Sequence, residues 1–193
     1  MMDVGTQTLE TERLLLRRFT VEDAEEMYTN WASDPVVTKY LTWPVHENVD
    51  ATRSLLANWV ESYSDPVNYH WGIQLRQGSL IGSIGVVRFD DEVEMKSLGY
   101  CIGQAWWGKG YTSEALAAVI GFLIERVGVN RVEAFHDPAN PASGRVMEKC
   151  GMRHEGIFRS QMKSNQGITD ASCWAILAND YHMSLTLGIT VKA

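Results

Sequence analysis

The sequence has few cysteines, no long apolar run and no excess of basic residues. Its three cysteines, Cys101, Cys150 and Cys173, form no CxxC pair. An odd number of widely spaced thiols argues against a disulfide framework and favours a reducing cytoplasm. The longest apolar stretch of helical pattern, about 115–124, is too short to span a bilayer, so no membrane partner is expected. The first residues lack a basic start followed by an apolar block, so we expect no secretory signal.

Basic charge is scarce as well. The chain carries 17 Lys and Arg against 24 Asp and Glu, a net charge of -7. No broad basic field is available to displace counterions, so nucleic acid is not an expected partner. The same balance means that a phosphate ligand must be held by local geometry. It weakly favours a cationic second substrate.

The composition is that of one globular domain. Hydrophobic residues make up 45% and charged residues 21% of the 193 positions, which is enough for a full hydrophobic core. No repeat, low-complexity stretch or linker divides the chain. We therefore expect a flexible N-terminal tail at 1–8, a single domain at 9–187 and a C-terminal tail at 188–193, in a monomer or homodimer.

Hydrophobic periodicity predicts a mixed α/β (α+β) architecture. Helices are predicted at about 20–31, 50–63, 112–127 and 140–151. Strands are predicted at about 13–19, 70–76, 80–89, 96–102, 130–136, 153–159 and 170–177. This order implies a central mixed sheet of about seven strands with four to five helices packed on it.

The densest chemical signal is the run Trp106-Trp107-Gly108-Lys109-Gly110-Tyr111-Thr112, between a predicted strand and a long helix. Two glycines one residue apart let the backbone turn sharply. The amides that follow begin a helix and have no intrahelical acceptor, and the helix dipole adds positive charge there. The pattern predicts a pyrophosphate site.

Two nucleotide-binding alternatives fit this run less well. The segment 103–109 matches the GxxxxGK part of a P-loop, but Gly110 follows where a serine or threonine should hold magnesium. The dinucleotide pattern GxGxxG fails because Ser113 occupies the third glycine position.

Two separated motifs resemble the GCN5-related N-acetyltransferase (GNAT) family. WWGKGYTSEAL (106–116) resembles that family's acetyl-CoA pyrophosphate loop, and DPANPASGRVMEKCGM (137–152) resembles the segment that completes its cofactor site. ETERLLLRRFTVEDAEEMY, HEGIFRS and DASCWAIL resemble the branch that acetylates the amino termini of ribosomal proteins. The resemblance spans about 9–181. It implies the GNAT acyl-CoA N-acyltransferase fold, acetyl-CoA as co-substrate, no metal and an acyltransferase activity.

The resemblance also implies which residues hold acetyl-CoA. The pyrophosphate would be held by main-chain amides of Trp107, Gly108, Lys109, Gly110, Tyr111 and Thr112. The strand of Tyr100, Cys101 and Ile102 would pair with the pantetheine arm, and Asn140 and Ser143 would complete the site. The family carries arginine or glutamine where Ala105 stands, with Gln104 one place early. Because main-chain amides dominate such sites, this departure should cost little.

Each residue of the second motif also has a purely structural explanation. Asn140 precedes Pro141 and could simply cap a helix. Ser143 could be solvated at the third helical position, or could protonate or hydrogen-bond the departing thiolate. Gly144 costs a helix about 1 kcal/mol relative to alanine, which is consistent with close approach of the cofactor or with tight packing.

Acetyl transfer needs a neutral amine, a hydrogen-bond donor for the developing oxyanion and a leaving thiolate. Tyr100 is a catalytic candidate because a strand amide at 100–102 can donate to the oxyanion, and Ser143 is a candidate on the thiolate side. Cys101 and Cys150 lack a neighbouring histidine or cationic partner in sequence, so we interpret them as core residues.

The general base is missing from its expected place. Many related enzymes carry glutamate two residues before the glycine of a GY pair, but Ser97 stands two residues before Gly99-Tyr100. Glu94 is the substitute included among the catalytic candidates, and His136 and Glu155 are others. A water chain, or an amine that arrives neutral, would remove the need for a base.

The expected reaction is direct transfer of acetyl to a primary amine, foremost the N-terminal α-amine of a protein or peptide. One alternative is a small amine such as an aminoglycoside, a polyamine or an amino acid. Another is a noncatalytic acyl-CoA sensor. The acceptor groove is expected between the loop that carries Trp43, the helix at 50–63 and a polar loop at 162–170.

Overall fold

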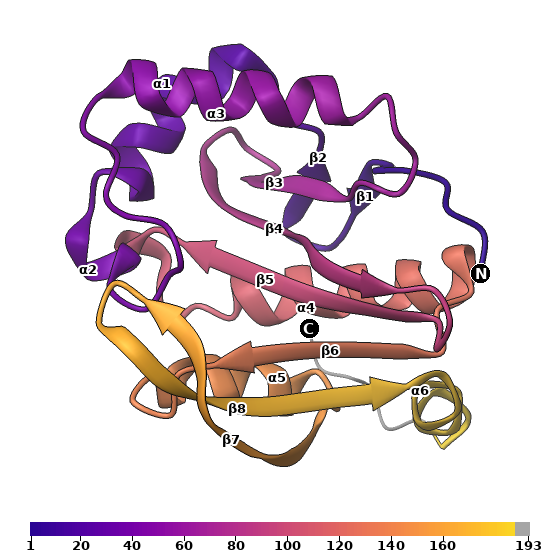
Figure 1. Ribbon diagram of the computed structural model, residues 1–193. Coiled ribbons are helices and arrows are strands. Elements are labelled where there is room, and N and C mark those ends of the chain that lie inside the picture. The colour runs from indigo at the N-terminus through magenta and orange to yellow at the C-terminus, as the bar shows by residue number, and fades with distance from the viewer. Residues whose placement is uncertain (188–193) are drawn as a thin grey trace.

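The computed structural model describes residues 1–187, and its centre is one eight-stranded sheet with the order β1-β2-β3-β4-β5-β6-β8-β7 (Figure 1). Only β5 and β6 are parallel, and all other neighbours are antiparallel. The strands are β1 (Leu9–Glu10), β2 (Leu14–Arg17), β3 (His70–Leu75), β4 (Leu80–Asp90), β5 (Met95–Ile102), β6 (Arg131–His136), β7 (Arg153–Ser164) and β8 (Gly167–Leu177).

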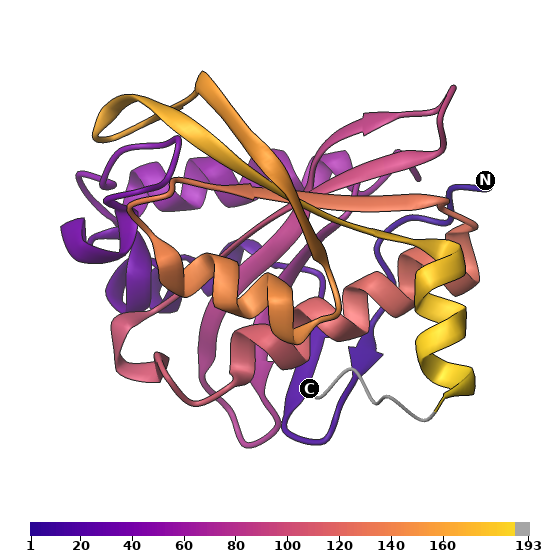
Figure 2. The ribbon, with the colours of Figure 1, turned by 90° about the horizontal axis from the view of Figure 1, so that it is seen from below.

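Helices cover both faces of the sheet. They are α1 (Ala24–Met27), α2 (Pro35–Thr38), α3 (Val49–Ser62), α4 (Tyr111–Phe122), α5 (Pro141–Lys149) and α6 (Ala178–Thr186). Figure 2 shows α4 and α5 side by side on one face and α3 on the other. The interior side of α4 is almost wholly apolar, with Ala115, Leu116 and Val119 fully buried, so this helix belongs to the main core. No helix of the described chain is long and apolar enough to cross a membrane.

The predicted mixed sheet with packed helices is confirmed, with eight strands and six α-helices in the described residues. The strand missing from the prediction is β1, which is two residues long and too short to show a period of alternation. The predicted helix at 112–127 is α4 followed by a wider π-type turn, Leu123–Val127. The six residues 188–193, expected as a tail, lie outside the described part of the chain.

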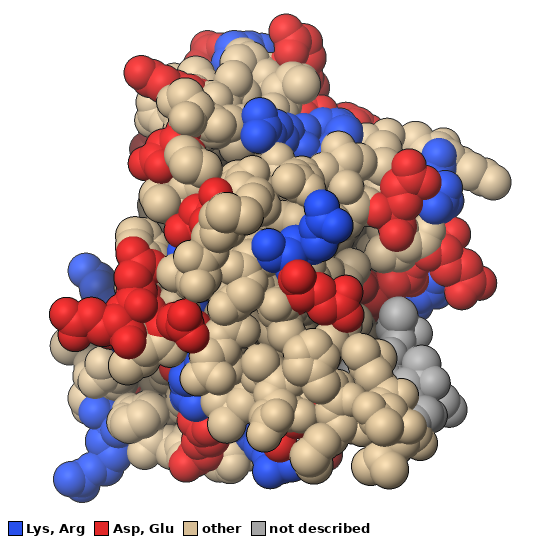
Figure 3. Space-filling model, turned by 90° about the vertical axis from the view of Figure 1, so that its right-hand side faces the viewer, with Lys and Arg blue, Asp and Glu red and all other residues tan. Residues whose placement is uncertain are grey.

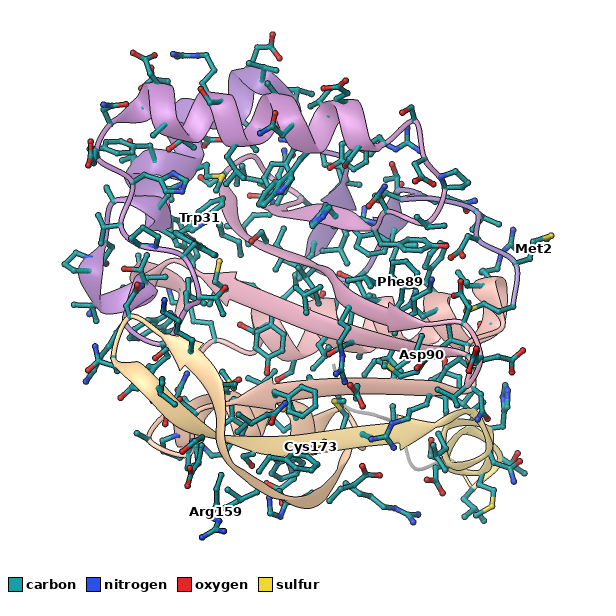
Figure 4. The ribbon with its side chains drawn as sticks, viewed as in Figure 1. Met2, Trp31, Phe89, Asp90, Arg159 and Cys173 are labelled. Atoms are coloured by element: carbon teal, nitrogen blue, oxygen red, sulfur yellow. The ribbon has the colours of Figure 1, made fainter. Side chains whose placement is uncertain are left out.

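A second apolar cluster lies between α1, α3 and the sheet. Trp31 and Met27 are fully buried there against Leu56 and Leu80. Figure 4 places Trp31 between the helices and the sheet, whereas Arg159 on β7 projects away from the fold. The two clusters hold the middle strands rigidly from both faces, so side chains at the ends of these strands have defined positions.

The expected polar loop at 162–170 is instead the tip of a long hairpin. β7 continues to Ser164 and β8 begins at Gly167, with Ser164 paired to Gly167. The pairing partners of these polar residues are main-chain groups, so side-chain polarity did not reveal the strands. The prediction of a loop was wrong here.

The N-terminal residues, expected as a flexible tail at 1–8, lie against the sheet. The amide of Met2 donates to the carbonyl of Val127 at 2.7 Å. Lys96, whose side chain is fully buried, forms an ion pair of 3.0 Å with Asp3, and the Tyr69 hydroxyl donates to the same carboxylate at 2.7 Å. The segment therefore supplies the counter-charge of a buried lysine.

Replacing Asp3 with alanine should lower the free energy of unfolding by about 3–5 kcal/mol, because it leaves the Lys96 ammonium buried and unpaired. Chemical denaturation measures the change. Glu94→Ala is the control: its ion pair with the Met1 amine is half exposed, so the expected loss is below about 1 kcal/mol. Lys96→Met in the Asp3→Ala background should recover most of the loss. Equal stabilities of the Asp3 and Glu94 variants would contradict this account.

Figure 3 shows the end of the molecule that carries the β4–β5 turn and α6. Acidic and basic side chains alternate over this surface and no single sign dominates. The negative net charge is therefore not gathered into one patch on this face.

Candidate active site

A cleft opens where β5 and β6 separate. Their parallel pairing runs from Met95↔Arg131 only to Leu98↔Ala134. Beyond that point β5 stays with β4 as far as Ile102, and β6 stays with β8 as far as His136. A bulge at Val87 on β4 adds local twist at the same level. None of the described strands covers the β6-facing edge of residues 99–102, which can pair with an extended chain except at the Ile102 carbonyl, already bonded to the Trp107 indole.

The cleft has a volume of about 1070 Å³ and extends to both sides of the sheet. One part lies between the end of β5, the loop before α4 and the start of α5. The other part lies among the segment 36–43, Trp59 of α3, the start of β3 and Met162 of the β7–β8 hairpin. A long, thin ligand and a second molecule can therefore meet at the point where the strands diverge.

The loop before α4 has the geometry of an anion site. Gly108 and Gly110 have φ values of 73° and 84°, in the left-handed region that favours glycine. Within residues 1–187, the main-chain amides of 108–113 donate to no protein acceptor. Unpaired amides at the start of a 12-residue helix bind phosphate well.

Two side chains that the sequence did not single out fix this loop. Arg13 donates to the Lys109 carbonyl at 3.0 Å and to the Glu114 carboxylate at 2.6 Å, and its guanidinium lies over the Tyr111 ring. Burial would raise the pKa of Glu114, but hydrogen bonds from Thr11 and Arg13 outweigh it and hold that pKa below the ordinary value. Arg13 is 101 residues away from Glu114, so no local signal could reveal the pair.

Trp107 and Tyr111 occupy different places in the loop. The Trp107 indole donates to the Ile102 carbonyl at 2.8 Å, which ties the loop to the end of β5. Gly108, Gly110 and Thr112 line the cleft with Trp107, whereas Lys109 and Tyr111 do not and could contribute only their main-chain amides. The loop thus joins the strand end and the helix start in one surface.

Tyr100 and Ser143 form a hydrogen-bonded pair in the wall of the cleft. The Tyr100 oxygen lies 2.9 Å from Ser143 Oγ and donates to the Ser143 carbonyl at 3.1 Å. Burial strongly raises the pKa of Tyr100, so its hydroxyl is protonated throughout the neutral range. The sequence indicated Tyr100 only through its main chain, and its phenol as a proton donor appears only in the structure.

The structure distinguishes between the structural and the functional explanations for two residues of the second motif, 137–152. Asn140 is the N-cap residue of α5, but its side chain forms no capping hydrogen bond and it lines the cleft, so it is available to a ligand. Gly144 is explained by packing: a Cβ there would lie 2.8 Å from His136 Nε2 and 3.5 Å from the Trp174 ring. Close approach of α5 to β6, and not to a ligand, requires this glycine.

Glu94, a candidate for the base, lies outside the cleft. It occupies the β4–β5 turn and its carboxylate binds the Met1 amine at 3.3 Å. Tyr100 is six residues further along the chain, which is about 20 Å in a strand at roughly 3.3 Å per residue. Figure 4 shows Phe89 and Asp90 leading into this turn, near the N-terminus. The assignment of Glu94 as the base is therefore corrected: its carboxylate takes part in the contact with the N-terminal amine.

The other two candidates for the general base already form hydrogen bonds within the protein. Glu155 does not line the cleft, and a hydrogen bond from Arg131 lowers its pKa. His136 lines the cleft, but Nδ1 lies 2.8 Å from the Asp137 carbonyl and Nε2 accepts from the Trp174 indole at 3.1 Å. Burial lowers the pKa of His136, and both ring nitrogens are used. This histidine holds β6, β8 and α5 together.

Cys101 and Cys150 are buried core residues. Burial raises the pKa of Cys101 to about 11 and that of Cys150 to about 12, so both thiols stay protonated near neutral pH. Neither is an activated nucleophile. Direct transfer between two bound substrates needs no such carrier.

The β7–β8 hairpin closes the far part of the cleft by binding the segment 36–43. The Asn165 side chain donates to the carbonyls of Thr38 and Trp43 at 2.8 and 2.7 Å, and its amide donates to the Leu41 carbonyl at 3.0 Å. The two segments are more than 120 residues apart. This contact joins the loop of Trp43 to the hairpin tip, the two segments expected to flank the acceptor.

An open strand edge that ends at a helix N-terminal anion site, with a protonated tyrosine at the point of separation, defines an acyl-coenzyme A-dependent acyltransferase. The family description "Acetyltransferase (GNAT) domain" matches residues 13–153. The chain belongs to the GNAT family of acetyl-CoA-dependent N-acetyltransferases.

Individual relatives agree with this assignment. The chain is 31% identical over 176 residues to the N-acetyltransferase p20 of Bacillus licheniformis, covering 91% of this chain and 98% of that one. It is 38% identical over 83 residues to the [ribosomal protein uS5]-alanine N-acetyltransferase of Escherichia coli, covering 41% and 43%. A crystal structure of a GNAT-family acetyltransferase from Bacillus anthracis superposes with a TM-score of 0.79 at 28% identity, covering 90% and 99%.

Proposed function

We propose that this protein transfers acetyl from acetyl-CoA to the N-terminal α-amine of a protein or peptide. The observation that carries the proposal is the two-sided cleft, which has an anion site at one end and a broad second mouth at the other. A relative is named for acetylating the alanine of ribosomal protein uS5, which is an acceptor of this kind.

The residues of the first side fit acetyl-CoA. The amides of 108–113 would hold the pyrophosphate, and the open edge of 99–102, apart from the Ile102 carbonyl, would pair with the pantetheine amides. The uncapped side chain of Asn140 would bind the same arm. Bound acetyl-CoA supplies an acetyl thioester. Tyr100 is placed to hold a proton for the departing sulfur, and Ser143 orients the phenol.

The charge of the second side favours a singly charged amine over a polycation. Within the part of the chain that the structure describes, the cleft is lined by the cations Lys39 and Arg88 on that side and by Arg145 and Lys149 near α5, but by one carboxylate, that of Asp137. Asp137 lies beside the start of α5 and accepts from the Ala139 amide. An aminoglycoside or polyamine would lack partners for its several ammonium groups. The weak preference suggested by the net charge is therefore reversed locally.

A thiol-release assay with acetyl-CoA tests this proposal. We expect saturable thiol release with lysine-free peptides that begin with Ser, Ala or Met. We expect no release with the same peptides when their amino termini are blocked. Spermidine and kanamycin serve as the polycation arm, and free alanine as the amino-acid arm. Turnover with these small amines alone would select the alternative acceptor class. Tight binding of acetyl-CoA without thiol release from any amine would select a noncatalytic sensor.

A further inference from the structure

One row of residues crosses the middle of the sheet on the face that receives the acceptor. His70 of β3 pairs with Gly85 of β4, and Gly85 pairs with Gly99 of β5. Directly paired residues project to the same face of a sheet. Trp59 of α3 contacts His70, so this is the face covered by α3. Because Gly85 has no side chain, the His70 ring can lie over it, and beyond it Gly99 adjoins the Val87 side chain, whose Cγ1 would lie 2.9 Å from a Cβ at position 99.

The His70 ring is held over Gly85. It stacks on the Trp59 indole with 4.9 Å between centroids and 8° between planes. A Cβ at position 85 would lie 2.7 Å from His70 Nδ1, so the ring occupies the space that the glycine leaves. Its main chain is fixed as well, because the His70 amide donates to Thr6 Oγ1 and its carbonyl accepts from the Tyr63 hydroxyl. The imidazole is therefore positioned from three sides.

The ring nitrogens of His70 are unengaged within residues 1–187, and the residue lines the cleft. The two other histidines that are not fully exposed differ from His70 in this respect. His46 Nδ1 is bonded to Thr52, and both nitrogens of His136 have partners. A positioned imidazole with free nitrogens, facing the acceptor side of a transferase cleft, is a chemically competent proton acceptor.

We propose that His70 accepts the proton that the acceptor amine loses during acetyl transfer. This inference rests on the proposed function, since it concerns the same reaction. Gly85 and Gly99 lie on neighbouring strands, about 4.8 Å apart. A ring nitrogen over Gly85 therefore reaches, directly or through one water, an amine bound in the cleft beside Gly99 and the Val87 side chain. Gly99 is also the first β5 residue beyond the pairing with β6, which is where the thioester is expected.

The step balances within the residues present. His70 takes one proton from the acceptor ammonium, and the neutral nitrogen then forms its new bond to the acetyl carbon as the carbon–sulfur bond breaks. Tyr100 gives its hydroxyl proton to the sulfur that leaves with the bonding pair. The phenolate takes the second proton that the nitrogen releases, and the imidazolium returns its proton to solvent. The assignment also explains why position 97 can be a serine where related enzymes carry glutamate, because the base comes from β3.

The surroundings keep the imidazole neutral. Burial lowers the pKa of His70 from its ordinary value, so the ring is unprotonated at neutral pH. Tyr63 donates a hydrogen bond to the His70 carbonyl, and Arg18 lies over the Tyr63 ring, whereas the face of the imidazole is covered by the uncharged Trp59. Lys39 and Arg88 line the same side of the cleft, and Arg88 is paired with Glu133. The described contacts of His70 include no ion pair.

The test compares wild-type enzyme with His70→Gln in the thiol-release assay, using an Ala-initiated peptide. The variant should lose about 100-fold or more in kcat/KM for the peptide, the range of general-base catalysis, while the Kd for acetyl-CoA is unchanged. In the wild type, activity should fall as pH drops below the His70 pKa and the ring becomes protonated. That acid limb should be absent from the variant. His182→Gln, on the exposed surface of α6, is the matched control and should behave as wild type.

A second readout separates proton transfer from structural support. With an acceptor of low basicity, such as a peptide hydrazide, the amine is already neutral and the loss in His70→Gln should shrink. An equal loss for both acceptors with an unchanged acid limb would show that His70 only supports Trp59, and would overturn the proposal. If the wild type acetylates small amines alone, the peptide assignment fails, whereas the His70 comparison made on those amines still decides this inference.

Discussion

Replacing Gly108 with glutamate is expected to weaken acetyl-CoA binding at least 100-fold, which corresponds to about 2.8 kcal/mol. The substituted carboxylate would stand among the unpaired amides of 108–113, where the pyrophosphate is proposed to bind. Like charges would repel at short range, and the added side chain would compete for the same donors. A side chain at φ 73° also costs about 1–2 kcal/mol of backbone strain. Among residues 1–187, no heavy atom lies within 4 Å of a Cβ at this position, so the fold should remain intact.

Isothermal titration with acetyl-CoA measures the effect, and circular dichroism checks the fold. Gly108→Ala is the matched control, because it introduces the same backbone strain without the charge. Its affinity should fall by less than about tenfold, since only part of the strain of roughly 1–2 kcal/mol opposes binding. Wild-type affinity in the glutamate variant would remove the anion-site assignment from this loop.

Replacing Tyr100 with phenylalanine is expected to lower kcat by about 100-fold or more, with little change in the Kd for acetyl-CoA. The phenol is the protonated group in the cleft wall at the end of β5, and general acids contribute about 10²–10⁴-fold to such reactions. Removing it leaves the sulfur without this donor and leaves Ser143 Oγ without its partner at 2.9 Å. Because burial raises the pKa of Tyr100, wild-type activity should show no loss from its ionisation up to about pH 10.

Steady-state and single-turnover thiol release distinguish a slower chemical step from slower binding. Tyr181→Phe provides a matched control on α6, where the hydroxyl donates to Glu125 and burial raises its pKa to about 12. That variant should keep wild-type kcat. Ser143→Ala should lose less than Tyr100→Phe, since it removes only an orienting hydroxyl. If Tyr100→Phe turned over at the wild-type rate, a water molecule would have to supply the proton, and the pair would be structural.

The base illustrates how far reasoning from sequence extends. Ser97 shows that the acid typical of related enzymes is missing, and the sequence offers Glu94, His136 and Glu155 as replacements. The structure removes all three by position or by existing bonds. His70, which the sequence places at the start of an ordinary strand, is brought to the acceptor side by strand pairing alone. Its partner glycines are 15 and 29 residues away along the chain.

What the sequence determined by itself is local. The order of helices and strands other than β1, α2 and α6, the glycine turn before α4 and the helix that starts at Pro141 follow from side-chain period and backbone preference within a few residues. The tertiary structure alone decided three contacts. They are the ion pair of Arg13 with Glu114 that supports the loop before α4, the hydrogen bond between Tyr100 and Ser143, and the hydrogen bonds from Asn165 to the segment 36–43. Each of these joins residues more than 40 positions apart. Such contacts depend on strand register and on how the helices pack, which only the folded chain specifies.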